Sequence, residues 1–418
     1  MNLKTFTFSI TVLCPLFAAA QIDGYKATYY ADGNVEKEQY RSNATIESVS
    51  SESSAMYATN GVKLNVAHLH INKTIGVTTN TSRRENGVNS AVLIDGGSTV
   101  RMDFCDANSH SAGSDCVTAL GEGTKVTVYQ GVYKTSRSGC AVFNAGGGAS
   151  MSVNEAQMET YSGQSPSFYT TKGGNIDVIK CRGTNSGQAA PMFQSSGNIT
   201  AKECYMTSSK WTMGSVDGGS LTLAKNHLAS GGVSGFLVYG AKERSEGGSL
   251  NLIKNYLTVG EGPLFLVTNT SAEIIMIKNK VNYKNDEVMS VRSDDWGEKG
   301  KNGGNAVLTL EDQSLKGAIS VDSISSLNLV LNKGGKLNGQ INKTENRCAE
   351  VRVVLNKGSQ WKSKGNSYVT SVEFDGPVEK GLKRMKGKHT IYYDASDPKN
   401  ASLEGKTYKK WRSKLCPL

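Results

Sequence analysis

The chain has 418 residues, with 46 glycines, 7 prolines and 38% hydrophobic residues, a composition typical of a turn-rich all-β protein and not of a disordered chain. The 47 Lys and Arg against 37 Asp and Glu give a net charge of +10, spread thinly except toward the C-terminus. This excess would suit an acidic polysaccharide or another anionic surface, although a soluble face that is merely basic explains it more simply.

Residues 1–20 have the features of a secretory signal peptide. Lys4 supplies the positive start, residues 6–17 are mostly apolar, and three alanines before Gln21 form a small-residue cleavage site. The apolar run is too short to cross a bilayer, and no later segment is long and apolar enough for a membrane span. We therefore expect a secreted protein that is extracellular or associated with the cell surface.

Residues 21–54 are polar, with weak strand alternation. We expect them to form an N-terminal cap, because the open end of a stacked repeat needs a cover. Residues 55–71 resemble a first, diverged repeat.

One pattern then recurs at intervals of about 24 residues. This period lies within the range that is typical of repeat architectures. Each copy has a Gly-rich turn, a short alternating strand, one small residue, a second short strand and a polar loop. The first strand and its small residue occupy 100–105, 126–131, 151–156, 176–181, 199–204, 221–226, 250–255 and 274–279.

The alternation within each copy predicts the fold. Residues two apart on a strand share a face, so apolar side chains such as Leu250 and Leu252 point inward and Asn251 points outward. A copy is too short for a crossover helix, and stacking it on the next copy builds a continuous core. The sequence predicts an all-β fold, a single right-handed parallel β-helix (β-solenoid) over residues 55–375.

The sixth position of each copy is small or turn-forming. We interpret it as a bend, where Asn and Gly tolerate positive φ and where equivalent asparagines can form a hydrogen-bonded ladder. A second turn is predicted at the glycine pairs. The sixth positions are Cys105, Gly131, Ala156, Cys181, Cys204, Asn226, Asn255 and Asn279.

A polar insertion interrupts the repeats between 288 and 306, and further strands are predicted at 306–310, 318–321, 327–331, 351–355 and 368–374. Residues 376–418 are Lys-rich, which predicts a basic C-terminal cap or tail.

Eight cysteines are present, and cleavage after residue 20 would remove Cys14 and leave an odd number. Secretion permits disulfides. Cys181 and Cys204 share a position on adjacent copies, and the strand spacing fits the Cα separation of a disulfide. Cys105 and Cys116 are close enough in sequence to clip the loop between them. The connectivity of the others stays open.

Seven N-x-Ser/Thr sequons are candidates for N-glycosylation if the chain passes through a eukaryotic secretory pathway. In a bacterium they would carry no such meaning. They are Asn43, Asn72, Asn80, Asn198, Asn269, Asn342 and Asn400.

The sequence contains no nucleophile elbow, phosphate-binding loop, dinucleotide fingerprint or zinc-protease motif, and we expect no cofactor, metal site or nucleic-acid partner. Asp294 and Asp295 are the weak catalytic candidates, because enzymes that cleave polysaccharides use paired carboxylates. Lys225, Lys254 and Lys278 align in one column and are weak candidates for glycan binding, although such a column also serves simply to keep a turn soluble.

Residues 262–271, 303–310, 319–329, 368–372 and 391–401 carry a resemblance to a group of secreted right-handed parallel β-helix proteins, themselves similar to the passenger regions of adhesins and autotransporters. The chain departs from that group in its extra Lys and Cys and in its last residues. The resemblance implies the fold and no catalytic residues. Our leading hypothesis is a non-enzymatic, adhesin- or effector-like surface protein that binds a polysaccharide, a cell-surface glycan or a host protein. The alternative is a carbohydrate-active enzyme, similar to pectate lyases or polygalacturonases, on an acidic polysaccharide.

Overall fold

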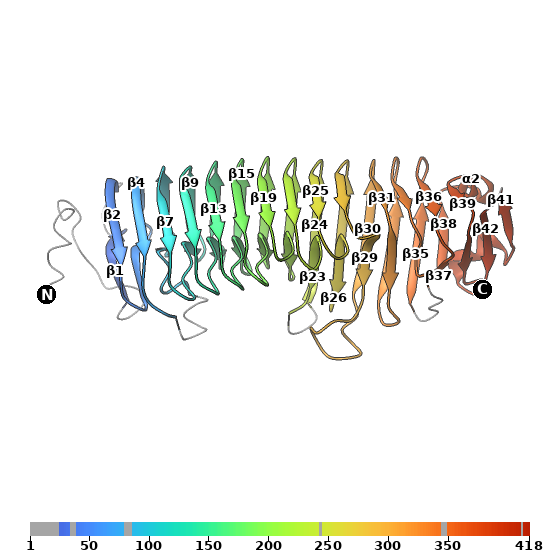
Figure 1. The fold of residues 1–418 in the computed structure, drawn as a ribbon, viewed down its shortest axis with the longest axis horizontal. Coiled ribbons are helices and arrows are strands. Elements are labelled where there is room, and N and C mark those ends of the chain that lie inside the picture. Colours follow the sequence, from blue (N-terminus) through green and yellow to red (C-terminus); the bar gives the residue numbers. More distant parts are fainter. Residues whose placement is uncertain (1–24, 34–38, 79–85, 242–244, 344–348, 411–412) are drawn as a thin grey trace. The chain divides into compact units, whose positions relative to one another are not determined.

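The computed structural model describes residues 25–33, 39–78, 86–241, 245–343, 349–410 and 413–418. These residues form a parallel β-solenoid of about 15 turns with almost no helix, which confirms the predicted fold class (Figure 1). The described chain divides into two compact units, residues 1–211 and 212–418. The predicted signal peptide lies outside the described residues.

In unit 1 each regular coil contributes one strand to a first sheet and two consecutive strands to a second sheet. All pairings between coils are parallel. The first sheet contains β1 (Lys26–Asp32), β3 (Ser53–Thr59), β5 (Val92–Ile94), β8 (Val117–Leu120), β11 (Phe143–Gly146), β14 (Phe168–Thr170) and β17 (Phe193–Ser195). The second contains β2 (Gln39–Ser48), β4 (Lys63–Lys73), β6 (Thr99–Asp103), β7 (Asp106–Ser109), β9 (Lys125–Tyr129), β10 (Val132–Thr135), β12 (Ser150–Asn154), β13 (Gln157–Thr160), β15 (Asn175–Ile179), β16 (Arg182–Asn185), β18 (Asn198–Lys202) and β19 (Tyr205–Ser208).

Unit 2 repeats this arrangement. Its first sheet contains β20 (Gly214–Val216), β23 (Phe236–Tyr239), β26 (Phe265–Thr268), β29 (Glu287–Val291) and β32 (Ala318–Val321). Its second sheet contains β21 (Ser220–Ala224), β22 (His227–Ser230), β24 (Ser245–Ile253), β25 (Tyr256–Val259), β27 (Thr270–Ile277), β28 (Lys280–Tyr283), β30 (Asn305–Glu311), β33 (Ser326–Leu331), β35 (Glu350–Leu355) and β38 (Ser371–Phe374).

The last coils of unit 2 add two short sheets. The third sheet is parallel and contains β31 (Ser314–Lys316), β34 (Lys336–Asn338), β36 (Gln360–Ser363) and β39 (Met385–Gly387). The fourth contains β37 (Ser367–Val369), β40 (Thr390–Tyr393), β42 (Ser413–Pro417) and β41 (Tyr408–Lys410), and its β41–β42 pair is antiparallel. Helix α2 (Val378–Leu382) and the 3₁₀ helix η3 (Pro398–Leu403) lie between these strands.

The period-two alternation sets the core. In β12, Met151 and Val153 are buried and pair in register with the buried Val126 and Val128 of β9. The first sheet adds a column of stacked rings, in which Phe168 lies between Phe143 and Phe193 at centroid distances of 5.5 and 5.4 Å. Each coil therefore buries its apolar face only against its neighbours, as expected for a solenoid.

The bend between the two strands of the second sheet differs from the prediction. The residue before the sixth position has the positive φ, and Gly131 is the exception with a positive φ of its own at 105°. The left-handed residues include Phe104, Gln130, Glu155, Lys180 and Glu203 in unit 1 and Lys225, Lys254 and Lys278 in unit 2, with φ between 53° and 59°. The sixth-position side chains are small because they are enclosed within the bend.

Three sixth positions in unit 2 form the predicted asparagine ladder. The side-chain amide of Asn226 donates to Oδ1 of Asn255 at 3.0 Å, and that of Asn255 donates to Oδ1 of Asn279 at 2.9 Å. Asn279 in turn donates to Oε1 of Gln313 at 3.1 Å. The turn at the glycine pairs is confirmed at Gly96, Gly147, Gly173 and Gly218, which have positive φ, whereas Gly247 lies within strand β24 at an irregularity in its pairing with β27.

The segment expected to cap the N-terminal end already has solenoid character. Strands β1 and β2 pair in parallel register with β3 and β4. Parallel pairing also continues past residue 376, where β39 pairs with β36 and β40 pairs with β37.

Candidate functional site

An open groove of about 540 Å³ crosses the second sheet of unit 2 near the start of its strands. It runs over β24, β27, β30, β33 and β35, which follow one another by parallel pairing. At about 4.8 Å per strand, these five strands span about 19 Å. The volume lies within the range of small-molecule binding sites. Its lining includes Ser249, Ser271, Glu273, Asn305, Ser326, Asn328, Glu350 and Arg352.

Small and polar residues make the groove both shallow and hydrogen-bonding. At its β24 end, Gly219 and Gly247 carry no side chain to fill it, whereas Gly248 faces the core, where a Cβ would meet Val216 and Val238. In the middle, Ser326 donates to Oδ1 of Asn305 at 3.1 Å. Oδ1 of Asn328 is buried and has no hydrogen-bond partner among the described residues. Buried acceptors are normally satisfied, but this oxygen exposes almost no surface, so a ligand in the groove does not reach it in this conformation.

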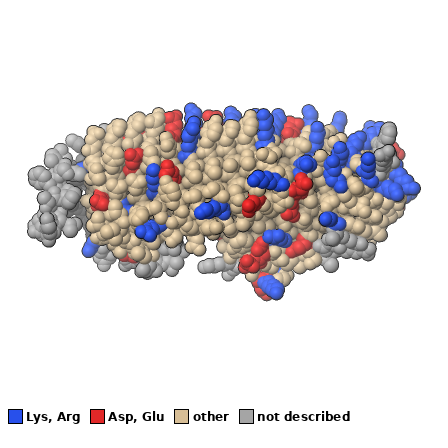
Figure 2. All heavy atoms as spheres, viewed as in Figure 1, with Lys and Arg blue, Asp and Glu red and all other residues tan. Residues whose placement is uncertain are grey.

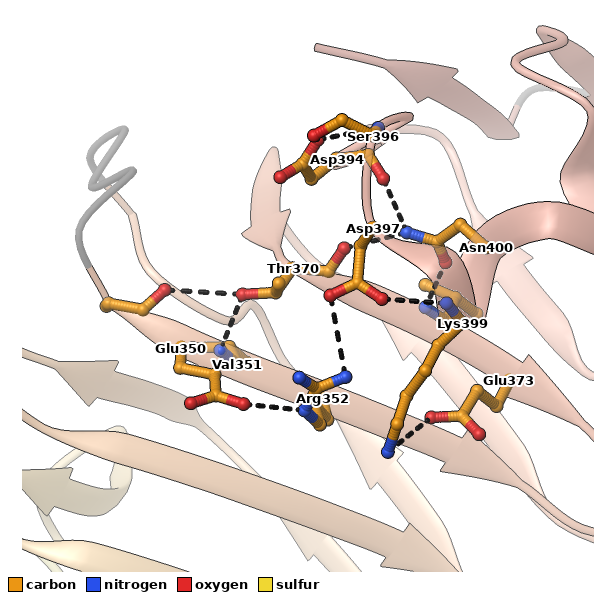
Figure 3. A network of polar contacts seen from close by, with 12 residues as sticks. Glu350, Val351, Arg352, Thr370, Glu373, Asp394, Ser396, Asp397, Lys399 and Asn400 are labelled. Carbon is orange, nitrogen blue, oxygen red and sulfur yellow. Dashed lines mark hydrogen bonds and ion pairs between the residues drawn. The ribbon is translucent and has the colours of Figure 1, made fainter.

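An ion-pair network closes the β35 end of the groove (Figure 3). Nε of Arg352 lies 2.7 Å from Oε1 of Glu350, and its Nη1 lies 3.5 Å from Oδ2 of Asp397. Asp397 also caps η3, because its Oδ1 accepts the backbone N–H of Lys399 at 2.8 Å. Burial is the largest single influence and lowers the pKa of Arg352, but the carboxylates of Glu350, Asp397 and Glu373 together outweigh it and raise that pKa above its ordinary value. The Arg352 side chain is thus held as a fixed cation.

The two carboxylates that line the groove are far apart. Glu273 is in register with Val307, Asn328 and Arg352 on successive strands. Glu350 therefore lies three strands and two residues away, which is about 16 Å. Glycosidases place their carboxyl pair within about 10 Å. Glu273 and Glu350 are too widely separated to act on one glycosidic bond.

The predicted catalytic candidates lie on the insertion between β29 and β30, outside the groove lining. Oδ2 of Asp294 pairs with Arg292 at 3.1 Å, and its Oδ1 accepts the backbone N–H of Asp295 at 2.9 Å. The insertion is fixed by Asn302, which donates to the carbonyls of Asp294 and Trp296 at 2.6 and 2.9 Å. These contacts give Asp294 a structural role in holding the conformation of the insertion.

The predicted lysine column exists. Lys225, Lys254 and Lys278 are exposed residues at the left-handed bend position of successive coils. Lys278 lies 3.4 Å from Oδ2 of Asp312 on a later coil. None of the three lines the groove, so a role in glycan binding stays a prediction.

Six cysteines are described, and no disulfide joins any of them. Cys181 and Cys204 do lie on adjacent coils, as the backbone N–H of Tyr205 donates to the carbonyl of Cys181 at 3.0 Å. A hydrogen bond with Cys204, together with burial, raises the pKa of the Cys181 thiol, and the same hydrogen bond lowers the pKa of Cys204. Cys105 and Cys116 are separately engaged, with thiols directed to the carbonyls of Val66 and Lys134, respectively. The predicted adjacency of Cys181 and Cys204 is present without the covalent bond.

The sequons fall into two groups. Asn43 and Asn198 are exposed, Asn72 is half-buried and Asn80 lies outside the described residues. The other three are buried and serve the fold: Asn269 donates to Gly240 and Asn400 to Thr370, both at 2.8 Å, and Oδ1 of Asn342 accepts from Val321 at 2.8 Å. Glycosylation of Asn269, Asn342 or Asn400 would be incompatible with this packing, whereas at Asn43, Asn72 and Asn198 it stays a prediction.

Sequence reasoning missed the groove. Its lining alternates Ser, Asn and Glu at outward strand positions, where the sequence indicates only polar residues that face solvent.

Among the described residues, no group of three metal-ligating side chains is close enough to hold an ion, and no helix is long and apolar enough to span a membrane. Searches against protein-family models, curated proteins and solved structures found no match for the chain.

Proposed function

We propose that the protein is a non-enzymatic, adhesin-like binding protein of the cell exterior, and that the groove of unit 2 holds a stretch of an extended, neutral glycan. The observation that carries this proposal is the groove itself, whose hydroxyl, amide and carboxylate side chains recur on five successive strands. Their interval of about 4.8 Å is comparable with the length of one pyranose ring. A chain laid across the strands would meet a similar set of polar groups at each sugar.

The charge of the groove favours a neutral ligand. Glu273, Glu350 and Arg352 are its ionisable groups, and together they carry one net negative charge. A uronate polymer would therefore be repelled here despite the +10 charge of the whole chain. The separation of Glu273 from Glu350 supports binding over cleavage. An extracellular location rests on the signal-peptide features of residues 1–20.

The test is an array of neutral and acidic polysaccharides probed with the purified protein, with assays for reducing ends and unsaturated products on each hit. Ser271 is exposed in the groove, and Thr258 is exposed on β25 outside it. We expect Ser271→Trp to weaken binding of a neutral glycan at least tenfold, whereas the matched Thr258→Trp leaves it unchanged. Equal effects of both variants would contradict the assignment of the groove, and product release would contradict the non-enzymatic function.

A further inference from the structure

The third sheet of unit 2 has one apolar and one basic face. Its inward side chains Leu315, Leu337, Trp361 and Met385 are all buried. The indole N–H of Trp361 donates to the carbonyl of Gly339 at 3.0 Å, which fixes the ring beneath the sheet. The outward residues are therefore carried on a rigid platform.

The outward face of this sheet is occupied by lysines. Of its outward residues, Lys316, Lys336, Lys362 and Lys386 are exposed lysines, and the others are Ser314, Asn338 and Gln360, so none is acidic. We call these four lysines the lysine face. Figure 2 shows Lys and Arg side chains gathered along the upper edge of the view, over the C-terminal strands drawn in orange and red in Figure 1.

The register places these charges in rows. Lys316, Asn338, Lys362 and Lys386 are successive partners across β31, β34, β36 and β39. The interval is therefore about 5 Å between Lys362 and Lys386 and about 10 Å between Lys316 and Lys362. Like charges on directly neighbouring strands oppose sheet formation. A bound polyanion would relieve that repulsion.

Few of the described carboxylates neutralise the charges of the lysine face. Lys316 lies 3.8 Å from Oδ1 of Asp286, but both side chains are largely exposed, at 72% and 86%, so the pair is weak. No carboxylate among the described residues lies within ion-pair distance of Lys336, Lys362 or Lys386. The charge on this face is available to a partner.

We propose that the lysine face binds a linear acidic polysaccharide, whose carboxylate or sulfate groups recur at intervals of the same order as the lysines. This proposal is independent of the groove. A single-stranded nucleic acid would need exposed rings for its bases, and the outward positions of this sheet hold none. A membrane surface would favour exposed apolar side chains, and the exposed large hydrophobic residues all lie elsewhere.

The test compares two variants of equal charge. The first carries K316Q, K336Q, K362Q and K386Q. The control carries K63Q, K125Q, K172Q and K210Q, which remove four exposed lysines of unit 1. Binding to polygalacturonate and to dextran sulfate is measured over a range of salt concentrations, with neutral dextran, duplex and single-stranded DNA, and phosphatidylserine vesicles as further probes.

We expect the wild-type protein to bind one or both acidic polysaccharides, with an affinity that falls as salt rises. The lysine-face variant should lose at least tenfold in affinity and most of the salt dependence, whereas the control variant should lose less than threefold. Equal losses in both variants would show a diffuse charge effect and overturn the proposal. Binding to DNA or vesicles alone, or to none of the probes, would overturn it as well.

Discussion

Asn255 donates a hydrogen bond from its side-chain amide to Oδ1 of Asn279 on the next coil, at 2.9 Å. The same amide donates to the carbonyl of Leu223 at 2.8 Å, and Oδ1 of Asn255 accepts from the backbone N–H of Asn226 at 2.9 Å. One buried side chain thereby links three coils, through two backbone groups of the preceding coil and the side chain of Asn279 on the next coil.

Replacing Asn255 with Ala should therefore destabilise unit 2. The change leaves the Leu223 carbonyl and the Asn226 N–H without these partners in a buried place, and each unsatisfied group costs about 1–3 kcal/mol. We expect the urea midpoint of unfolding to fall clearly. The control is Asn282→Ala on β28, where the side chain is exposed and the midpoint should hardly move. A loss no larger than that of the control would mean that the ladder contributes little.

The asparagine ladder could be predicted from the sequence because it depends only on the spacing of the repeats. Successive copies align by their spacing, so Asn226, Asn255 and Asn279 fall into one column from sequence alone. The position of the left-handed residue was not predictable, because Lys254 gives no sign that it, and not Asn255, adopts positive φ.

The groove was hidden for a different reason. Its side chains meet only after coils of unequal length are brought into register, as Glu273, Val307, Asn328 and Arg352 are. The insertion between β29 and β30 breaks the regular spacing just where the groove lies. A repeat pattern therefore predicts which residues face inward, but not which outward residues from such coils become neighbours.

Lys73 is a fully buried cation in unit 1, and its burial predicts how the stability of the fold depends on pH. Its Nζ lies 3.1 Å from Oγ of Ser48 and 3.4 Å from Oγ of Ser53, and it also contacts the carbonyl of Ser50. Burial lowers the pKa of Lys73 from 10.5 to about 8, although Glu52 partly opposes the change. The folded state thus binds this proton less tightly than the unfolded state.

The direction in which folding stability changes with pH follows from that difference. Between about pH 8 and the ordinary pKa of 10.5 the unfolded chain carries more protons, so stability should rise with pH across this window. The full difference corresponds to about 3 kcal/mol, and the penalty is complete below pH 8. Lys73→Met should remove the rise, because Ser48 and Ser53 remain hydrogen-bonded to each other at 2.6 Å. Denaturation curves at pH 7.5, 8.5 and 9.5 measure it, with exposed Lys63→Met as the control; parallel curves for wild type and Lys73→Met would contradict the prediction.

Labelling of the cysteines can distinguish a thiol that is only buried from one that is bonded in a disulfide. Cys181 and Cys204 are both fully buried, and burial also raises the pKa of Cys105 to about 11. Burial keeps the reagent from all three sulfurs, so none of them should react with a maleimide in the native protein at pH 7, although the hydrogen bond with Cys181 lowers the pKa of Cys204. Cys416 is partly exposed and should be labelled first among the six described cysteines, with Cys416→Ser removing that label.

In denaturant without a reductant, peptide mass spectrometry should find Cys181 and Cys204 both labelled, since the structure holds them as thiols. If the two peptides take the label only after reductant is added, the neighbouring coils are joined by a disulfide in the isolated protein. Cys204→Ser is the matched variant, because it leaves Cys181 without a bonding partner on that coil. Labelling of Cys181 in the denatured variant but not in the denatured wild type would then assign the bond to this pair.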